Sequence, residues 1–395
     1  MKYDIIIIGA GTVGLIFAKS LGETGLKIAV IEKKPINKLS KPEFDGREIA
    51  LTHFSYKILK KLQILDFIPN KYISKIKKAK VLNEESSYSL FFDTSKNKKD
   101  SIGFVISNAR ILEAGYNSIK QYKNIKILHN QEVVSIVTNK KNASVGLLKG
   151  NNIQASLVIA ADSRFSPSRK MIGISTSMLD FGRTCIVCNM SIELDHKNVA
   201  YEIFKFDKTI AVIPLNNYQV SVVMTVNSVE SNNILNMSAN KFEADLENRL
   251  ALRFGKMKLI SRLFSYPLIS TYAKKFTSNR VAFIGDAAVG MHPVTAHGFN
   301  LGIRSINILS DLINKSFYLN NNFSSRKLLE EYDKSLHKIS FPLYHATNIL
   351  VKLYTNNSIT AKYARRLILR LGNFKPAKNY IIKKLMDDSI RKTFY

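Results

Sequence analysis

The chain has 395 residues, of which 46% are hydrophobic and 10% aromatic, and its formal net charge at pH 7 is +29. This length and apolar content exclude a disordered chain and predict a globular protein of two structural units. The excess of basic residues suits binding to an anionic membrane, or it reflects the lysine-rich bias of an AT-rich genome. The sequence contains no RNP-like aromatic run, zinc finger or basic heptad array, so we expect no nucleic acid as a partner.

The first predicted element is a strand over residues 3–8, because this short apolar run is nearly continuous, as in strands buried on both faces. The sequence GAGTVG follows at residues 9–14, and a helix over residues 15–21 and a second strand over residues 27–32 come next. No charged n-region or cleavage site precedes the first strand, so we expect no signal peptide. No apolar run approaches the roughly 20 residues of a spanning helix.

The glycine-rich turn has the spacing GxGxxG, in which each glycine has a physical role. Gly9 permits the tight turn, Gly11 lets the backbone approach a pyrophosphate, and Gly14 lets the helix pack close to the strand. The helix N-terminus offers free N–H groups to phosphates, and Glu32, at the end of the second strand, can accept from ribose hydroxyls. We therefore predict a bound adenine dinucleotide, the alternative being a glycine-rich turn that is only structural.

Two further stretches are ambiguous when each is taken alone. FDGREIAL places Arg47 beside a glycine just before a predicted helix, which also fits a surface arginine in a loop. VIAADSRFSPSRK is an apolar strand ending at Asp162 and followed by two arginines, which also fits a strand end with a helix cap. Neither stretch identifies a site by itself.

Cys185 and Cys188 form a lone CxxC within an alternating, strand-like stretch. A zinc site needs two more ligands nearby, and a redox pair belongs at a helix start after a strand. In a strand the two thiols point to opposite faces. We therefore expect two core cysteines in a reducing compartment.

The sequence GDAAVGMHPVTAHGFNLGI occupies residues 285–303, between an apolar strand over residues 281–284 and a helix that resumes near Leu301. It contains four glycines, a proline and two histidines but only one acidic side chain. Glycines allow a backbone to approach a flat ring closely, and a helix N-terminus there stabilises negative charge. The stretch therefore suits a flat ring that becomes negatively charged.

In this order, the stretches together resemble the single-component flavin-dependent aromatic monooxygenases, and most closely the bacterial ubiquinone-biosynthesis hydroxylases. ADSRFSPSR stands in place of the family's Asp-Gly motif, with Ser163 where glycine is usual. GDAAVGMHPVTAHGFNLGIRS resembles the second FAD motif, with His297 where many members carry glutamine, as in the demethoxyubiquinol hydroxylase subgroup. IGFVISNARILEAGYNSI matches the segment before the family's central helix. The resemblance covers roughly residues 3–345.

The resemblance implies roles for individual residues. Arg47 and Arg110 would contact the FAD diphosphate and ribose region, and Asp162 would influence the use of NAD(P)H. Asp286 would hold a ribityl hydroxyl, while Pro293 and His297 would lie at the reacting ring as the catalytic candidates. The full cofactor-binding set comprises Gly9, Gly11, Gly14, Glu32, Arg47, Arg110, Asp162, Gly285, Asp286, Pro293, Gly298 and Asn300.

The implied reaction is FAD-dependent hydroxylation of the aromatic ring of a polyprenylated phenol or quinol in ubiquinone biosynthesis, through a flavin C4a-hydroperoxide and with NAD(P)H and O2. Such an intermediate must be kept from water, which suits an apolar, glycine-lined loop, and no metal is expected. Two alternatives remain open. One is another flavoenzyme of this fold, an isoprenoid reductase or a soluble-phenol hydroxylase. The other is a non-catalytic flavin-binding scaffold of a biosynthetic complex.

The expected fold is α/β. It has a three-layer Rossmann-like FAD/NAD(P)-binding domain with a parallel sheet, an inserted and mostly antiparallel β substrate domain, and C-terminal helices. We place the FAD-binding domain in residues 1–72, 105–174 and 273–325, and the substrate domain in residues 73–104 and 175–272. Residues 226–234 are polar and expected to form a loop.

The C-terminal region, residues 326–395, is predicted to be helical and basic. Its last part fits either a solvated face of a packed helix or a helix lying on an anionic membrane surface. We expect a cytoplasmic protein, with peripheral contact to the inner membrane as the open alternative. Other ubiquinone-biosynthesis proteins are the remaining implied partners.

Overall fold

The apolar N-terminal run forms β1 (Lys2–Ile8), which lies between two parallel neighbours inside a sheet. Ile5, Ile6 and Ile7 are fully buried, as a strand covered on both faces requires. The computed structural model describes residues 2–83, 89–93, 100–150, 152–204, 208–216, 218–292, 297–320 and 322–355.

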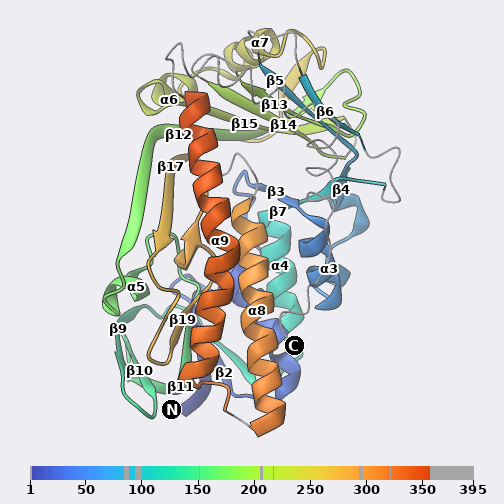
Figure 1. Cartoon of the computed structure of the whole chain (residues 1–395). Helices are drawn as coiled ribbons and strands as arrows, with labels where there is room; N and C mark the ends of the chain where they lie inside the picture. Colours follow the sequence, from blue (N-terminus) through green and yellow to red (C-terminus); the bar gives the residue numbers. More distant parts are fainter. Residues whose placement is uncertain are drawn as a thin grey trace.

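The lower sheet in Figure 1 has eight strands and a parallel centre. Its path runs in the order β18 (Thr277–Ser278), β19 (Val281–Phe283), β11 (Ile153–Ala160), β1, β2 (Ile28–Ile31) and β8 (Ile125–Leu128), with β10 (Ala143–Leu147) and β9 (Val133–Thr138) attached to β11. The strands from β19 to β8 are parallel to their neighbours, whereas β18, β10 and β9 pair antiparallel. This arrangement confirms the Rossmann-like prediction.

The upper sheet has nine strands and is mostly antiparallel, as predicted, with one parallel pair between β13 and β5. Its order is β20 (Val289–Gly290), β17 (Phe264–Ala273), β12 (Thr176–Ile192), β15 (Gln219–Asn227), β14 (Thr209–Pro214), β13 (Val199–Phe204), β5 (Lys78–Asn83) and β6 (Ser89–Asp93), with β16 (Met257–Leu259) on β12. Figure 1 shows β12 and β17 rising along one side of the molecule into this sheet.

A small sheet of three strands lies between the two larger ones (Figure 1). It contains β3 (Glu48–Leu51), β7 (Gly103–Ser107) and β4 (Ser74–Ile76), with β7 in the middle. Arg47 therefore precedes a strand, and the expected helix, α3, begins only at His53. The short apolar run after Arg47 was too brief to distinguish a strand from a helix start.

The helices cover both large sheets. They are α1 (Thr12–Ser20), α2 (Asn37–Ser40), α3 (His53–Lys61), α4 (Asn108–Ile119), α5 (Pro167–Met171), α6 (Ser228–Leu235), α7 (Ala239–Arg249), α8 (His297–Asn320) and α9 (Arg326–Thr355). Short 3-10 turns occur at Gly22–Thr24, Leu65–Phe67, Asn70–Tyr72 and Gly285–Ala287, the last labelled η4. In Figure 1, α8 and α9 run side by side as two long helices, while α6 and α7 cap the upper sheet.

One predicted loop is wrong, because α6 occupies most of residues 226–234. The Asn227 side chain accepts a hydrogen bond from the Val229 N–H, so the polar composition reflects a capped, partly exposed helix. The prediction for the two cysteines is confirmed. Cys185 and Cys188 are buried, unpaired and packed in separate apolar clusters on opposite faces of β12.

The predicted C-terminal helix begins with α9, and residues beyond 355 lie outside the described part of the chain. Across the described residues, no helix has the length and apolar character needed to cross a bilayer. The division of the chain into two domains at the expected boundaries remains a prediction. The segment 273–325 supplies strands to both large sheets, β19 to the lower and β20 to the upper.

Candidate active site

The turn between β1 and α1 has the geometry that its glycines predict. Gly9 has a φ of 103°, and a Cβ there would lie 2.5 Å from the carbonyl oxygen of Ala161. A Cβ on Gly14 would lie 2.0 Å from the Gly9 carbonyl oxygen, so only glycine allows α1 to pack this closely. A Cβ on Gly11 would meet no atom of the described chain within 4 Å. An open cradle therefore lies at the start of the helix.

The N-terminus of α1 is suited to bind an anion. Its cap residue is Gly11, which makes no side-chain cap, and the first turn contains no acidic residue. Glu32 lies beside this turn, because its Oε2 accepts from the Ala10 N–H at 2.9 Å and its Oε1 accepts from the Lys34 N–H at 3.0 Å. Helix N–H groups bind phosphate and such a carboxylate accepts from ribose. These residues fit the adenosine diphosphate half of a dinucleotide.

The second glycine-rich stretch meets the first in space. Gly285 has a φ of 59°, and a Cβ there would lie 3.0 Å from Val13 in the α1 turn. A Cβ on Gly302 would lie 3.1 Å from Val13 and 3.6 Å from the Gly285 Cα. The Gly285 N–H also donates to the Ser305 hydroxyl of α8 at 3.2 Å. The structure thus joins η4, α1 and α8 at one point, which the sequence separates by almost 300 residues.

Asp286 and Gly298 face each other across this junction. A Cβ on Gly298 would have the Asp286 Oδ1 as its nearest neighbour, at 4.0 Å. The Asp286 side chain is 42% exposed, and its Oδ2 lies 3.3 Å from Nη2 of Arg164. One carboxylate oxygen is therefore held by Arg164, while the other faces the space at the start of α8.

Two arginines that the sequence did not single out hold this region in place. Arg164 donates to the carbonyl oxygens of Ile269 at 2.6 Å and Met291 at 3.3 Å. Arg169, which is 2% exposed, donates to the carbonyl oxygen of Ala287 at 2.6 Å. Both belong to the stretch ADSRFSPSR, and the pair of arginines was the only signal available. Their contacts fix the backbone around η4 and β20.

Asp162 lies beside the first glycine turn, since a Cβ on Gly9 would lie 3.0 Å from its Cα. Its two oxygens accept hydrogen bonds from the N–H groups of Ser163 and Ser168, both at 3.0 Å. The carboxylate closes the turn that leads into α5. The structure therefore brings Asp162 to the dinucleotide turn, with both oxygens engaged locally.

Asn300 joins the beginning of α8 to the small sheet. Its Nδ2 donates to the Ala50 carbonyl oxygen at 2.8 Å, and its Oδ1 accepts from the Thr52 N–H at 2.9 Å. The side chain is buried, at 6% exposure. Asn300 thus positions the start of α8 against the end of β3, bringing the Gly298 region to the small sheet.

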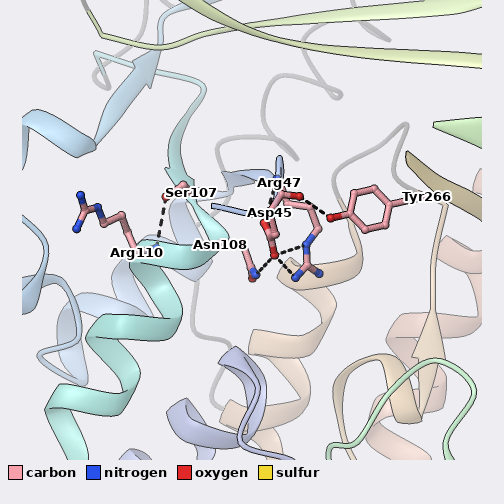
Figure 2. A network of polar contacts seen from close by, with 6 residues as sticks. All are labelled: Asp45, Arg47, Ser107, Asn108, Arg110 and Tyr266. Carbon is pink, nitrogen blue, oxygen red and sulfur yellow. Dashed lines mark hydrogen bonds and ion pairs between the residues drawn. The ribbon is translucent and has the colours of Figure 1, made fainter. Parts of the chain in front are cut away.

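Figure 2 shows that Arg47 and Arg110 point away from each other. The Arg47 guanidinium contacts Asp45, whose Oδ2 also accepts from Asn108 Nδ2 at 2.8 Å. The Tyr266 hydroxyl donates to the Asp45 carbonyl oxygen. Arg110 instead bonds Glu113 at 3.0 Å. The structure brings Arg47 to the upper sheet through Asp45 and Tyr266, but it does not bring Arg110 to Arg47.

The histidines of the second stretch lie in apolar surroundings. Burial, together with the positive charge of Arg304, lowers the pKa of His297 to about 4. Burial and the charge of Arg164 lower the pKa of His292 to about 3, and its ring packs edge-on against Phe181 with 5.2 Å between centroids. Both rings are therefore neutral at physiological pH. Pro293 lies outside the described residues.

The upper sheet presents an apolar surface to this region, formed by the buried residues Cys185, Val187 and Leu268 together with Val223 and Tyr266. A cavity of about 490 Å³ lies nearby, and its lining includes Glu48, Arg110 and Asn189. The Asn189 Nδ2 donates to Glu48 Oε1 at 3.1 Å. Burial raises the pKa of Glu48 to about 7, although this hydrogen bond opposes the shift.

Comparison with known proteins gives one family match over most of the chain. The model of the FAD binding domain family matches residues 2–341. Among curated relatives, the ubiquinone hydroxylase UbiM of Neisseria meningitidis is 43% identical over 387 residues, covering 97% of this chain and 84% of its own length. The 3-demethoxyubiquinol 3-hydroxylase of Escherichia coli is 22% identical over 365 residues, covering 92% of this chain and 93% of its own.

The fold is also found among solved structures. The p-nitrophenol 4-monooxygenase PnpA from Pseudomonas putida superposes with a TM-score of 0.76 at 18% identity, covering 98% of this chain and all of that one. At this identity the match establishes a shared fold. The glycine turns, Glu32 and Asp286 described above provide the site within it.

Proposed function

This chain belongs to the FAD binding domain family of flavin-dependent monooxygenases, and from that premise we propose that it hydroxylates the aromatic ring of a polyprenylated phenol or quinol intermediate. It is an FAD-dependent aromatic hydroxylase of ubiquinone biosynthesis that uses NAD(P)H and O2. That the substrate carries a polyprenyl tail, and that the hydroxylation occurs at one particular position of its ring, are parts of the proposal.

The observation that carries this proposal is the junction of the two glycine-rich turns beneath an apolar sheet surface. Gly285 and Gly302 approach Val13 so closely that any side chain at either position would crowd it. One end of the junction offers an uncapped helix N-terminus, and the other leads to the residues Cys185, Val187 and Leu268. An aromatic ring can bind at such a surface, because apolar walls exclude water from the reacting atoms.

The residues fit FAD along this path. We assign the pyrophosphate to the α1 N-terminus at Gly11, the ribose to Glu32, and a ribityl hydroxyl to Asp286. Bound FAD supplies the redox chemistry, accepting hydride from NAD(P)H and activating O2. The backbone at Gly298 leaves room for the flavin ring, while Asn300 holds that backbone against β3. The neutral ring of His297 adds no charge beside the flavin ring.

Other predicted residues enter the proposal with narrower roles. Arg47 is bound to Asp45, and we infer that it reaches the diphosphate by exchanging this contact. Asp162 positions the turn next to Gly9 and so affects nicotinamide use indirectly. Arg110 would have to leave Glu113 before it could contact the cofactor.

The test is anaerobic reduction of the purified FAD protein with NADH or NADPH, followed by oxygen in the presence of a short-chain prenylated quinol precursor. We expect hydroxylated product in proportion to the reduced flavin. Hydrogen peroxide as the sole product with every quinol offered, or saturation of an isoprenoid double bond, would contradict the proposal. The first outcome would favour a scaffold and the second a reductase.

We also propose that the basic C-terminal region brings the enzyme to the membrane surface. The last 45 residues carry eleven Lys and Arg against two Asp, interleaved with apolar residues. A polyprenylated substrate partitions into lipid, so the enzyme must meet the bilayer or a partner protein that extracts the substrate. Cations near an anionic leaflet contribute about 1 kcal/mol each.

A further inference from the structure

A half-buried carboxyl group lies on the face of the upper sheet that also carries the apolar surface. Glu202 of β13 pairs with Ala211, Ala211 pairs with Val223, and Val223 pairs with Val187. Residues directly opposite in antiparallel strands point to the same face. Glu202 therefore shares its face with Val187 and Val223 of the apolar surface.

The contacts of Ala200, the neighbouring residue on this face, show which part of the molecule the face packs against. Ala200 lies two residues before Glu202 and so points to the same side of β13. It packs with Ile76 of β4 and Val105 of β7 in the small sheet. In Figure 1, α6 and α7 lie above the upper sheet, whereas β3 and β7 lie below it. Glu202 thus points into the region between the upper and small sheets.

Glu202 has no compensating partner in the part of the chain that the structure describes. Its Oε1 is buried and accepts no hydrogen bond. Burial raises the pKa of this carboxyl to about 8, and no cation opposes the shift. Buried polar groups are nearly always paired, because an unmet hydrogen bond costs about 1–3 kcal/mol. An unpaired, buried carboxyl oxygen on this face therefore calls for a partner from outside the described chain.

The same face carries two more polar atoms of this kind. The Ser221 hydroxyl is fully buried, and together with the Oδ1 of Asn189 it has no hydrogen-bond partner within the described residues. Ser221 and Asn189 are directly paired across β15 and β12. A mostly apolar surface with a few convergent polar groups is typical of a site that orients a small ring.

Few charged groups of the described chain face this side of the sheet. The titratable groups adjacent to it are Glu48 of β3, Cys185 of β12, Tyr266 of β17, Arg164 from the turn after β11, and the pair Asp45 and Arg47 beside Tyr266. The next strands, β14 and β5, present Ala211 and Val81 beside Glu202. Of these groups, Cys185 lies close enough to feel Glu202: burial raises the pKa of its thiol to about 12, and the charge of Glu202 adds to the shift.

We propose that Glu202 is an acid–base residue of the hydroxylation, binding the phenolic hydroxyl of the substrate ring and accepting its proton. This inference rests on the proposed function. The O–H bond of the phenol breaks, its electron pair stays on the oxygen, and the proton moves to the Glu202 carboxylate. The phenolate ring is more electron-rich and so a better acceptor of an electrophilic oxygen atom. Glu202 returns the proton to the product oxygen before release.

The transfer is uphill by about two pKa units, or about 2.7 kcal/mol, so the proton moves to Glu202 as the ring takes up oxygen and bound phenolate does not accumulate beforehand. A phenol has a pKa of about 10, and burial brings Glu202 to about 8. A base is most effective when its pKa lies near the working pH. Because Glu202 must first lose its own proton, hydroxylation should rise with pH through about 8.

The test compares Glu202→Gln with Glu48→Gln in the full-length, FAD-loaded protein. Glu48 is the matched control, since burial also raises its pKa, to about 7, but its carboxylate is paired with Asn189. The first readout is the dissociation constant of a short-chain prenylated phenol, measured by its ultraviolet difference spectrum, which needs no turnover. The second is hydroxylated product per NAD(P)H oxidised, between pH 6 and pH 9.

We expect hydroxylation by the parent and by Glu48→Gln to rise with a midpoint near pH 8. Glu202→Gln should lose this pH dependence, bind the phenol more weakly and lose hydroxylation by about 10²- to 10⁴-fold, while its FAD content and its NAD(P)H oxidation persist. If Glu202→Gln fails to bind FAD, Glu202→Asp replaces it, because the shorter carboxylate should keep the pH dependence at weaker phenol affinity.

Two results would overturn the inference. One is a Glu202→Gln variant that still forms product within a few-fold of the parent, with the same pH dependence. The other is loss of the pH 8 transition in Glu48→Gln but not in Glu202→Gln. Either result would rule out Glu202 as the base, but the proposed function would still hold as long as the parent protein hydroxylates the quinol. A parent that binds the phenol in a Glu202-dependent way but yields no hydroxylated product would instead contradict the proposed function and leave Glu202 as a phenol-binding group.

Discussion

A position can require glycine because the fold leaves no room for a side chain, or because a bound cofactor does. We expect Gly298 to be of the second kind. Among the described residues of the protein alone, a Cβ at Gly298 would have only Asp286 Oδ1 within 4 Å, at 4.0 Å, which is an ordinary contact. Gly298→Ala should therefore fold normally, and a helical alanine should stabilise the apoprotein by up to about 1 kcal/mol. With FAD bound, the added methyl group would press on the flavin ring.

The expected loss follows from the cost of overpacking, which is about 1–3 kcal/mol for an inserted methyl group. At about 1.4 kcal/mol per tenfold change, FAD should bind roughly 5- to 150-fold more weakly. Fluorescence titration of the apoprotein with FAD measures this directly, and thermal unfolding of the apoprotein measures the fold.

Gly302→Ala in the same helix is the matched control. Its Cβ would lie 3.1 Å from Val13 and 3.6 Å from Gly285 even without a cofactor. We expect this variant to destabilise the apoprotein itself, by about 1 kcal/mol. The reasoning would be refuted if Gly298→Ala bound FAD as tightly as the parent, since the flavin ring would then not pass over Gly298.

Three further predictions concern charge. Asp286→Ala should weaken FAD binding about 10- to 100-fold, the value of a hydrogen bond to a charged group, and equilibrium titration would show no change if Asp286 lay outside the site. The pKa of Glu202 is raised from 4.5 to about 8 in the folded protein. Between these two pH values the folded protein keeps a proton that the unfolded chain has lost, so the stability of the fold falls as pH rises from 4.5 through 8. Glu202→Gln should therefore gain stability over the parent across this range, by at most about 5 kcal/mol, and a pH-independent difference in denaturant melts would contradict this. Replacing Arg365, Arg366 and Arg370 with Glu should reduce cosedimentation with anionic vesicles. If the variant binds the vesicles as well as the parent does, these arginines do not contact the membrane and belong to a solvated face.

The features that sequence could predict depend on short-range rules. GxGxxG predicted the β1–α1 turn because Gly9 and Gly14 act on each other within one turn, where a side chain would clash. The alternation around Cys185 and Cys188 predicted opposite faces because strands have a period of two. These arguments need no knowledge of distant parts of the chain.

The features that sequence missed depend on distant contacts. Arg164 and Arg169 act on the carbonyl oxygens of Ile269 and Ala287, more than 100 residues away. Nothing local marks them as different from surface arginines.

Glu202 was missed for a related reason. It occupies the polar position of an alternating strand, which ordinarily faces solvent. The small sheet covers this face instead, and only the assembled structure shows it. The polarity of Glu202 therefore became informative only once its burial was known.

The most direct test of the central claim is a single turnover under ¹⁸O₂. The FAD-loaded protein is reduced with NAD(P)H under anaerobic conditions and mixed with ¹⁸O₂ and a short-chain prenylated quinol precursor, and the product is analysed by mass spectrometry. The account predicts one ¹⁸O atom in a new ring hydroxyl for each productive NAD(P)H. Label found only in peroxide and water, with the ring unchanged, would contradict it.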